Sequence, residues 1–106
     1  MNSKQRKRLE DSGWHVGTAR DFLGLSEQEA LLLEIKLALA DALRDRRTKL
    51  GLTQHALARK LHSSPSRVAK MEGADASVSV DLVVTALLGL GATRRDLARV
   101  LAPRAA

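Results

Sequence analysis

The stretch from Thr53 to Glu72 restricts the possible folds of this chain more than any other. Leu57 and Leu61 recur at the spacing that gives a helix one apolar edge. Ser64 and Pro65 then restart a helix, because a capping hydroxyl is followed by proline at the first helical position, where its missing N–H costs nothing. The pattern predicts two short helices joined by a tight turn.

The side chains around this turn indicate how the two helices pack. Thr53 is a favoured N-cap residue for the first helix, and Ala58 is small where two steeply crossing helices need a close approach. Val68 and Met71 form the apolar edge of the second helix. The arrangement is a helix-turn-helix motif whose outward residues can donate hydrogen bonds to phosphates and base edges. These residues are Ser64, Ser66, Arg67 and Lys70.

Positive charge is concentrated at this motif and in the segment before it. Between Lys36 and Lys70 there are nine Lys or Arg residues and two acidic ones, in a chain whose net charge is +6. Most runs of charge only solvate a surface. Because this one coincides with a helix-turn-helix, we expect double-stranded DNA as a partner.

Composition limits the remaining architecture. Trp14 and Phe22 are the only aromatic residues, so the core must consist of Leu, Val, Ile and Ala, which suits packed helices better than a sheet. A length of 106 residues without cysteine predicts one domain without disulfides. The longest nearly apolar run, from Leu82 to Ala92, is too short to cross a bilayer. We expect an all-helical, cytoplasmic protein.

The chain divides into three parts. Residues 1–13 are predicted to form a flexible basic arm, residues 14–25 a short helical segment, and residues 26–102 the helix-turn-helix DNA-binding domain. The middle segment either packs on the helical body or contacts another protein, since aromatic residues dominate interface hot spots. The candidate contact residues are Trp14, Val16, Phe22 and Leu23.

Five or six helices account for the chain, and capping residues predict where they begin. Ser26 and Glu29 form a capping box that opens a long helix ending near Leu50, with Gly51 as its stop. The apolar face of this helix is predicted to contain Leu32, Ile35, Leu39, Leu43 and Leu50. After the motif we expect a stop at Gly73, a helix capped by Ser79, and a last helix opened by Thr93 and Asp96.

No arrangement of residues predicts catalysis. The three histidines form no short-spaced pair with each other or with a carboxylate, as a metal site would require. A glycine-rich phosphate loop is absent from the sequence. We therefore expect no enzyme activity, no cofactor and no metal.

Residues 46–72 carry a recurring pattern, which consists of Arg46-Arg47, Leu50-Gly51-Leu52-Thr53-Gln54, Leu57-Ala58, Leu61, Val68 and Glu72. The pattern resembles the Xre/Cro-type helix-turn-helix family. The resemblance implies a compact lambda-repressor-like bundle in which Thr53 and Gln54 add DNA contacts. It also implies an ion pair between Arg47 and Glu72 that ties the scaffold helix to the end of the recognition helix.

Two positions depart from the family pattern. His62 stands where glycine is usual, so a non-glycine residue is expected to adopt the left-handed conformation. Pro65 stands where glutamine, a base-reading residue, is common. Because proline donates nothing, base readout is expected to shift to its neighbours, with Arg67 and Lys70 the leading candidates.

Residues 13–17, 22–26, 34–37 and 79–82 also look like HigA-type antitoxins encoded beside RelE-like toxins. This resemblance implies a homodimer that represses its own operon and neutralises a RelE/HigB-like mRNA-cleaving toxin. Two alternatives remain open at this point. One is a stand-alone Xre-type repressor without a toxin partner, and the other is a protein-interaction adaptor on the same fold.

Overall fold

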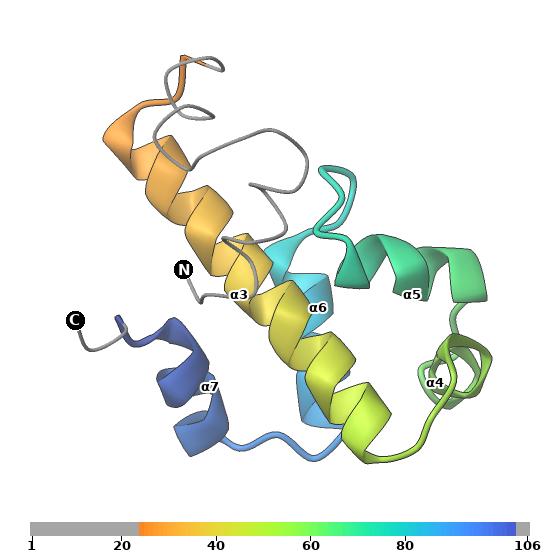
Figure 1. The fold of residues 1–106 in the computed structure, drawn as a ribbon. Coiled ribbons are helices and arrows are strands. Elements are labelled where there is room, and N and C mark those ends of the chain that lie inside the picture. The colour runs from red at the N-terminus through yellow and green to blue at the C-terminus, as the bar shows by residue number, and fades with distance from the viewer. Residues whose placement is uncertain (1–23, 104–106) are drawn as a thin grey trace.

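The computed structural model describes residues 24–103, which form five α-helices and no strand (Figure 1). The helices are α3 (Glu27–Lys49), α4 (Gln54–Lys60), α5 (Pro65–Glu72), α6 (Val80–Gly89) and α7 (Arg94–Leu101). The predicted all-helical class is confirmed. The basic arm and the predicted contact residues Trp14, Val16, Phe22 and Leu23 lie outside the described residues.

A hydroxyl side chain begins each of these helices. The residues concerned are Ser26, Thr53, Ser64, Ser79 and Thr93, and each accepts a hydrogen bond from the backbone N–H three residues later. The two predicted capping boxes are complete, because the side chains of Glu29 and Asp96 accept from the cap residue's own N–H. These N-caps are confirmed. Each cap typically contributes about 1 kcal/mol, which helps to fix where short helices start.

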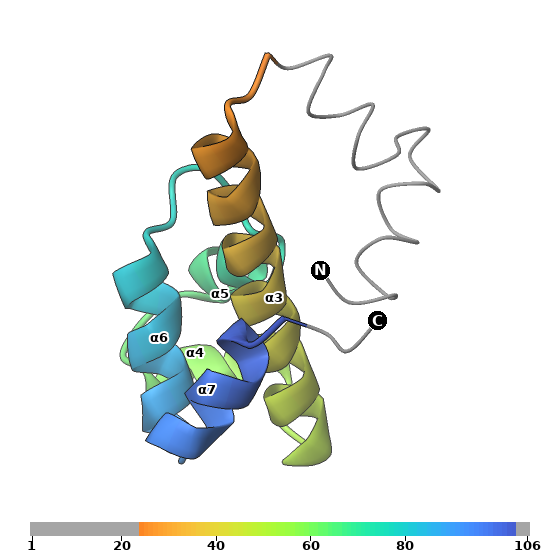
Figure 2. The ribbon, with the colours of Figure 1, turned by 90° about the vertical axis from the view of Figure 1, so that its left-hand side faces the viewer.

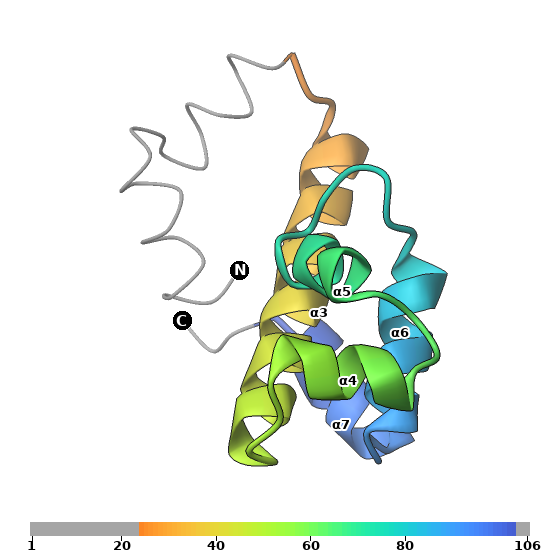
Figure 3. The same cartoon turned by 90° about the vertical axis from the view of Figure 1, so that its right-hand side faces the viewer.

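Helix α3 is the central element of the fold. It packs against α5, α6 and α7, while α4 packs against α5. Figures 2 and 3 view the molecule from opposite sides, with α7 beside α3 in one and α4 and α5 in front in the other. The helix-turn-helix and α7 therefore lie on different sides of α3.

The core lies where α3, α4, α5 and α6 meet. The largest fully buried apolar side chains are Leu39 and Leu43 of α3, Leu57 of α4, Val68 and Met71 of α5, and Leu87 of α6. Full burial of one such side chain contributes about 1.5–3 kcal/mol. The predicted helix pair thus supplies half of these core residues.

The prediction of the apolar face of α3 is confirmed for the middle of the helix and is wrong at both ends. Leu39 and Leu43 are buried, whereas Leu32 is 51% and Leu50 53% exposed. The reason is length, because α3 has 23 residues but α6 has 10 and α7 has 8. The shorter helices cannot cover every turn of the longer one.

Helices α3, α4, α5 and α6 are each followed closely by a left-handed residue. These are Gly51, His62, Ala74 and Gly91, with φ between 54° and 89°. The left-handed conformation expected of His62 is confirmed. The predicted stop at Gly73 is confirmed, because Gly73 is the C-cap of α5, with φ −91°, and the left-handed turn follows at Ala74. Both non-glycine residues flank α5.

None of the described helices combines the length and the apolar character that crossing a membrane would require.

Candidate nucleic-acid interface

The surface of α4 and α5 carries positive charge only. The sequence has no acidic residue from Arg46 to Met71, and the cations of both helices are exposed. These cations are Arg59 and Lys60 of α4 and Arg67 and Lys70 of α5. A surface with one sign of charge creates a potential that attracts a polyanion.

The four predicted contact residues around α5 lie along its exposed surface. The Ser64 hydroxyl accepts from the backbone N–H of Arg67 at 3.2 Å and lies 3.3 Å from the Ser66 hydroxyl. Arg67 and Lys70 are exposed and three residues apart, so they lie on the same face of the helix. The structure therefore places one cation in the first turn of α5 and the other in the next.

Thr53 and Gln54 lie at the start of α4, and both take part in internal hydrogen bonds. The Thr53 hydroxyl accepts from the backbone N–H of Ala56 at 3.0 Å. Gln54 is half-buried, and its Nε2 donates to Glu72 Oε1 at 3.2 Å. Because a carboxylate only accepts, the amide nitrogen must face Glu72, and its second N–H is left for another acceptor.

Arg47 and Glu72 form an ion pair at the end of α5. The Arg47 side chain donates from Nε to Glu72 Oε2 and from Nη2 to Oε1, the latter at 3.0 Å. Its Nη1 donates to the carbonyl of Leu52 at 2.8 Å. Glu72 is 0% exposed, and a carboxylate at that depth is tolerated because it is paired. The pair fixes the end of α5 against α3 and the segment that leads into α4.

Hydrogen bonding to Glu72 is the main cause that raises the pKa of the Arg47 guanidinium above its ordinary value, against the opposing effect of burial. The arginine therefore stays charged under all ordinary conditions.

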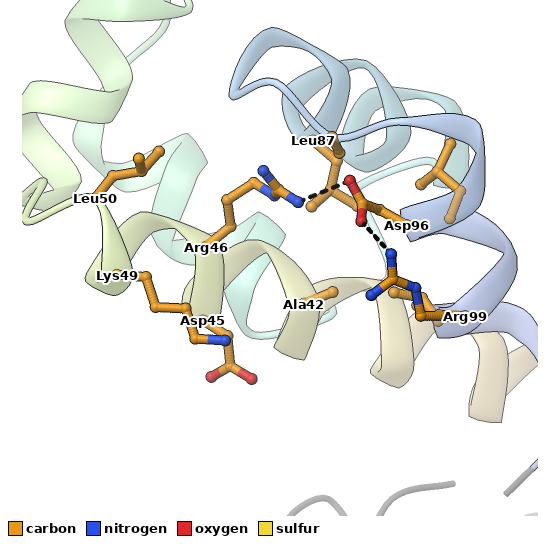
Figure 4. A pocket seen from close by; sticks show the side chains of 11 residues that line it. Ala42, Asp45, Arg46, Lys49, Leu50, Leu87, Asp96 and Arg99 are labelled. Atoms are coloured by element: carbon orange, nitrogen blue, oxygen red, sulfur yellow. Dashed lines mark hydrogen bonds and ion pairs between the residues drawn. The ribbon is translucent and has the colours of Figure 1, made fainter.

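The other side of α3 has an ion pair of a different kind, shown in Figure 4. Arg46 Nη2 donates to Asp96 Oδ2 at 3.0 Å, and Arg99 Nη2 donates to Oδ1 at 3.2 Å. Asp96 also accepts from the backbone N–H of Thr93 at 2.8 Å. The hydrogen bonds with Thr93 are the main cause that lowers the pKa of Asp96, and the two arginines add to the effect. A pocket of about 380 Å³ lies beside this cluster, between α3 and α7.

The fold changes how the basic charge of α3 is distributed. The carboxylates that pair with Arg46 and Arg47 belong to Asp96 and Glu72, both outside the basic stretch from Lys36 to Lys70. Part of the predicted charge excess is therefore neutralised within the protein. The four cations of α4 and α5 are exposed, so they keep the surface of the helix-turn-helix positive.

Sequence reasoning missed Arg59 and Lys60 as exposed cations of α4 and Arg44 as a neighbour of Glu72. The position of Arg59 and Lys60 in the last turn of the first motif helix was a usable signal. Arg44 Nε lies 3.6 Å from Glu72 Oε1. No local pattern reveals this proximity, because it depends on how α5 docks on α3.

Comparison with known proteins agrees with this geometry. A family model described as a helix-turn-helix domain matches residues 38–100, from the middle of α3 into α7. Searches among curated proteins and among solved structures found no significant match. The match covers more than half of the chain and includes the whole motif. The chain therefore belongs to the helix-turn-helix domain family, which indicates a DNA-binding regulator.

Proposed function

We propose that this protein is a sequence-specific regulator that binds double-stranded DNA, with α5 as its recognition helix and with no catalytic role. The observation that carries the proposal is the exposed surface of α4 and α5, which has four cations and no acidic residue. The buried Arg47–Glu72 pair supports it by holding α5 at a fixed angle to α3.

The residues of this surface divide into base-reading and positioning groups. An α-helix fits the major groove, and the N-terminal residues of a recognition helix reach the base edges. Arg67 lies in the first turn of α5 and is the strongest candidate for a base contact, with Lys70 next to it. The remaining predicted contacts, from Thr53, Gln54, Ser64 and Ser66, would hold the protein on the phosphate backbone.

The proposal includes a homodimer on the operator. A single helix of 8 residues presents few side chains to the bases. Two copies would double the contacts and read half-sites about 34–36 Å apart. Sedimentation of the protein with a selected duplex measures the number of copies bound.

Selection of binding sites from a random duplex library, followed by gel-shift titration, tests the DNA-binding proposal. Replacing Arg67 by Ala should weaken binding to the selected site by about 1–3 kcal/mol and relax base preference at one position. Arg94→Ala is the matched control, because Arg94 is an exposed arginine on α7. Equal effects of the two substitutions, or no site enriched by the wild type, would contradict the proposal.

A narrower function within this proposal is an antitoxin that represses its own operon and neutralises a RelE/HigB-like toxin in the cytoplasm. Support comes from the resemblance of residues 13–26 to HigA-type antitoxins. The N-terminal part of α3, which follows this segment, also exposes two large apolar side chains, since Leu31 is 57% and Leu32 51% exposed.

Co-purification with the product of the adjacent gene tests the antitoxin role. Replacing Trp14 and Phe22 together by Ala should abolish toxin capture and leave the gel shift unchanged. Capture that survives the double substitution would exclude the aromatic segment as the toxin contact. If the wild type does not capture the product of the adjacent gene, the antitoxin role fails and the protein is a stand-alone regulator.

A further inference from the structure

Arg44 of α3 and Gln54 of α4 meet at one oxygen atom. Arg44 Nε lies 3.6 Å from Glu72 Oε1, and Gln54 Nε2 lies 3.2 Å from the same oxygen. Two nitrogen groups from different helices are therefore neighbours at the start of the helix-turn-helix. The family resemblance implies a DNA contact for Gln54, whereas no such contact was predicted for Arg44.

Both groups keep hydrogen-bonding capacity at this point. Gln54 uses one N–H for Glu72, and its amide has a second. Arg44 is within ion-pair distance of Glu72, but at 3.6 Å its Nε is too far for a good hydrogen bond. The Arg44 side chain is 39% exposed, compared with 14% for Arg47, so Arg44 is the more accessible of the two arginines near Glu72.

The charge of the cluster favours an anion beside Arg44. The bidentate pair with Arg47 already compensates the single negative charge of Glu72. Arg44 adds a second positive charge next to this satisfied pair. A guanidinium has five N–H donors in a planar fork and binds phosphate oxygens well.

From this geometry we infer that Arg44 and the second N–H of Gln54 bind the same backbone phosphate of DNA. The inference rests on the proposed DNA-binding function and adds a contact to it. The site joins α3 to α4, so the bound phosphate would fix the register of the recognition helix on the duplex. It would not read sequence, because phosphates are the same at every base pair.

The salt dependence of DNA binding tests the role of Arg44. The logarithm of the binding constant falls with the logarithm of salt concentration, with a slope of about 0.9 per neutralised phosphate. Arg44→Gln should therefore reduce this slope by about one and leave base preference unchanged. Arg44→Lys keeps the charge and should keep most of the slope. Thermal unfolding of each variant verifies that it is folded.

Lys49→Gln is the matched control. It removes the same charge from the same helix, but Lys49 lines the pocket on the α7 side (Figure 4). Its slope should remain close to that of the wild type. If Arg44→Gln changes the slope no more than Lys49→Gln does, the inference is wrong. If the wild type binds no duplex in a salt-dependent way, the proposed function itself fails.

A double-mutant cycle tests whether one phosphate is shared. If Arg44 and Gln54 hold the same group, Arg44→Gln combined with Gln54→Ala should weaken binding by less than the product of the two single effects. Independent effects would assign the residues to different phosphates. The cycle can be interpreted when each of the three variants unfolds at a temperature close to that of the wild type.

Discussion

Two consecutive arginines hold the two sides of α3 in different ways. Arg47 points toward α5 and pairs with Glu72, which is 0% exposed. Arg46 points toward α7 and pairs with Asp96, whose side chain is 26% exposed. A buried carboxylate depends on its partner, whereas a partly exposed pair competes with water and salt. The two arginines are adjacent in the sequence, but burial and the two-oxygen geometry of the Glu72 pair separate the energies expected of the two pairs.

The connections around α5 differ from the others in a second respect. The left-handed residues on both sides of α5 are His62 and Ala74, whereas those after α3 and α6 are Gly51 and Gly91. A side chain in this conformation costs roughly 1–2 kcal/mol relative to the right-handed one. The recognition helix is thus held between two strained turns, and the strain must be offset by packing and by the Arg47–Glu72 pair.

Replacing Arg47 by Ala should have the largest effect on stability. It would leave Glu72 buried with only Gln54 as a hydrogen-bond donor and Arg44 nearby. Breaking a buried pair in this way typically lowers the free energy of unfolding by about 3–5 kcal/mol. Urea unfolding measures the loss. A loss below 1 kcal/mol would mean that this pair behaves like an exposed one.

Substitutions at the left-handed residues should have intermediate effects of opposite sign. His62→Gly and Ala74→Gly should each raise the free energy of unfolding by about 1 kcal/mol, because glycine adopts this conformation without strain. Gly51→Ala and Gly91→Ala should lower it by a similar amount. A Cβ at either glycine would meet nothing within 4 Å, so backbone strain alone would be measured. Thermal unfolding of the four variants measures these changes. If all four substitutions change stability in the same direction, the difference between the two kinds of turn is refuted.

Arg46→Gln should destabilise the protein only slightly. The pair of Arg46 with Asp96 is partly exposed, and ion pairs near the surface contribute about 0–1 kcal/mol and are screened by salt. The difference from the wild type should therefore shrink as salt rises, while the effect of Arg47→Ala should persist. Urea unfolding at low and high salt measures both. A large, salt-independent effect of Arg46→Gln would remove the distinction between the two sides of α3.

The smallest expected effect is that of Asp96→Asn on how the free energy of unfolding changes with pH in the acid range. The pKa of this carboxyl is lower in the folded state than in the unfolded chain, chiefly because of its hydrogen bonds with Thr93. Its stabilisation is therefore present above the unfolded value and is lost as pH falls through the folded value. Asp96→Asn should make stability less dependent on pH in the acid range. The midpoint of urea unfolding at a series of pH values measures this, and an unchanged pH profile would contradict it.

Local signals in the sequence predicted the helix starts well. A capping hydroxyl acts on a backbone N–H three residues away, so Ser26, Thr53 and Ser64 could be assigned without knowing the fold. The left-handed conformation of His62 was expected from the family pattern, in which glycine is usual at this position, and the structure confirms it.

Features that depend on packing could not be predicted in the same way. Arg46 pairs with a residue 50 positions later, and nothing near Arg46 distinguishes it from Arg47. Leu32 and Leu50 continue the apolar pattern of α3, but the shorter helices leave them exposed. The hydrogen bond from Gln54 to Glu72 also required the docked arrangement of α4 and α5.

The hydrogen bonds of Glu72 with Arg47 and Gln54, together the Glu72 cluster, also affect the unfolding rate of the helix-turn-helix. Its partners Arg47 and Gln54 lie 25 and 18 residues earlier, so the carboxylate is fully paired only after α3, α4 and α5 have docked together. We expect these bonds to form late in folding, so that losing them speeds unfolding and leaves the folding rate nearly unchanged. The cluster would then set the lifetime of the DNA-binding surface, while the local caps and the apolar core set how fast it forms.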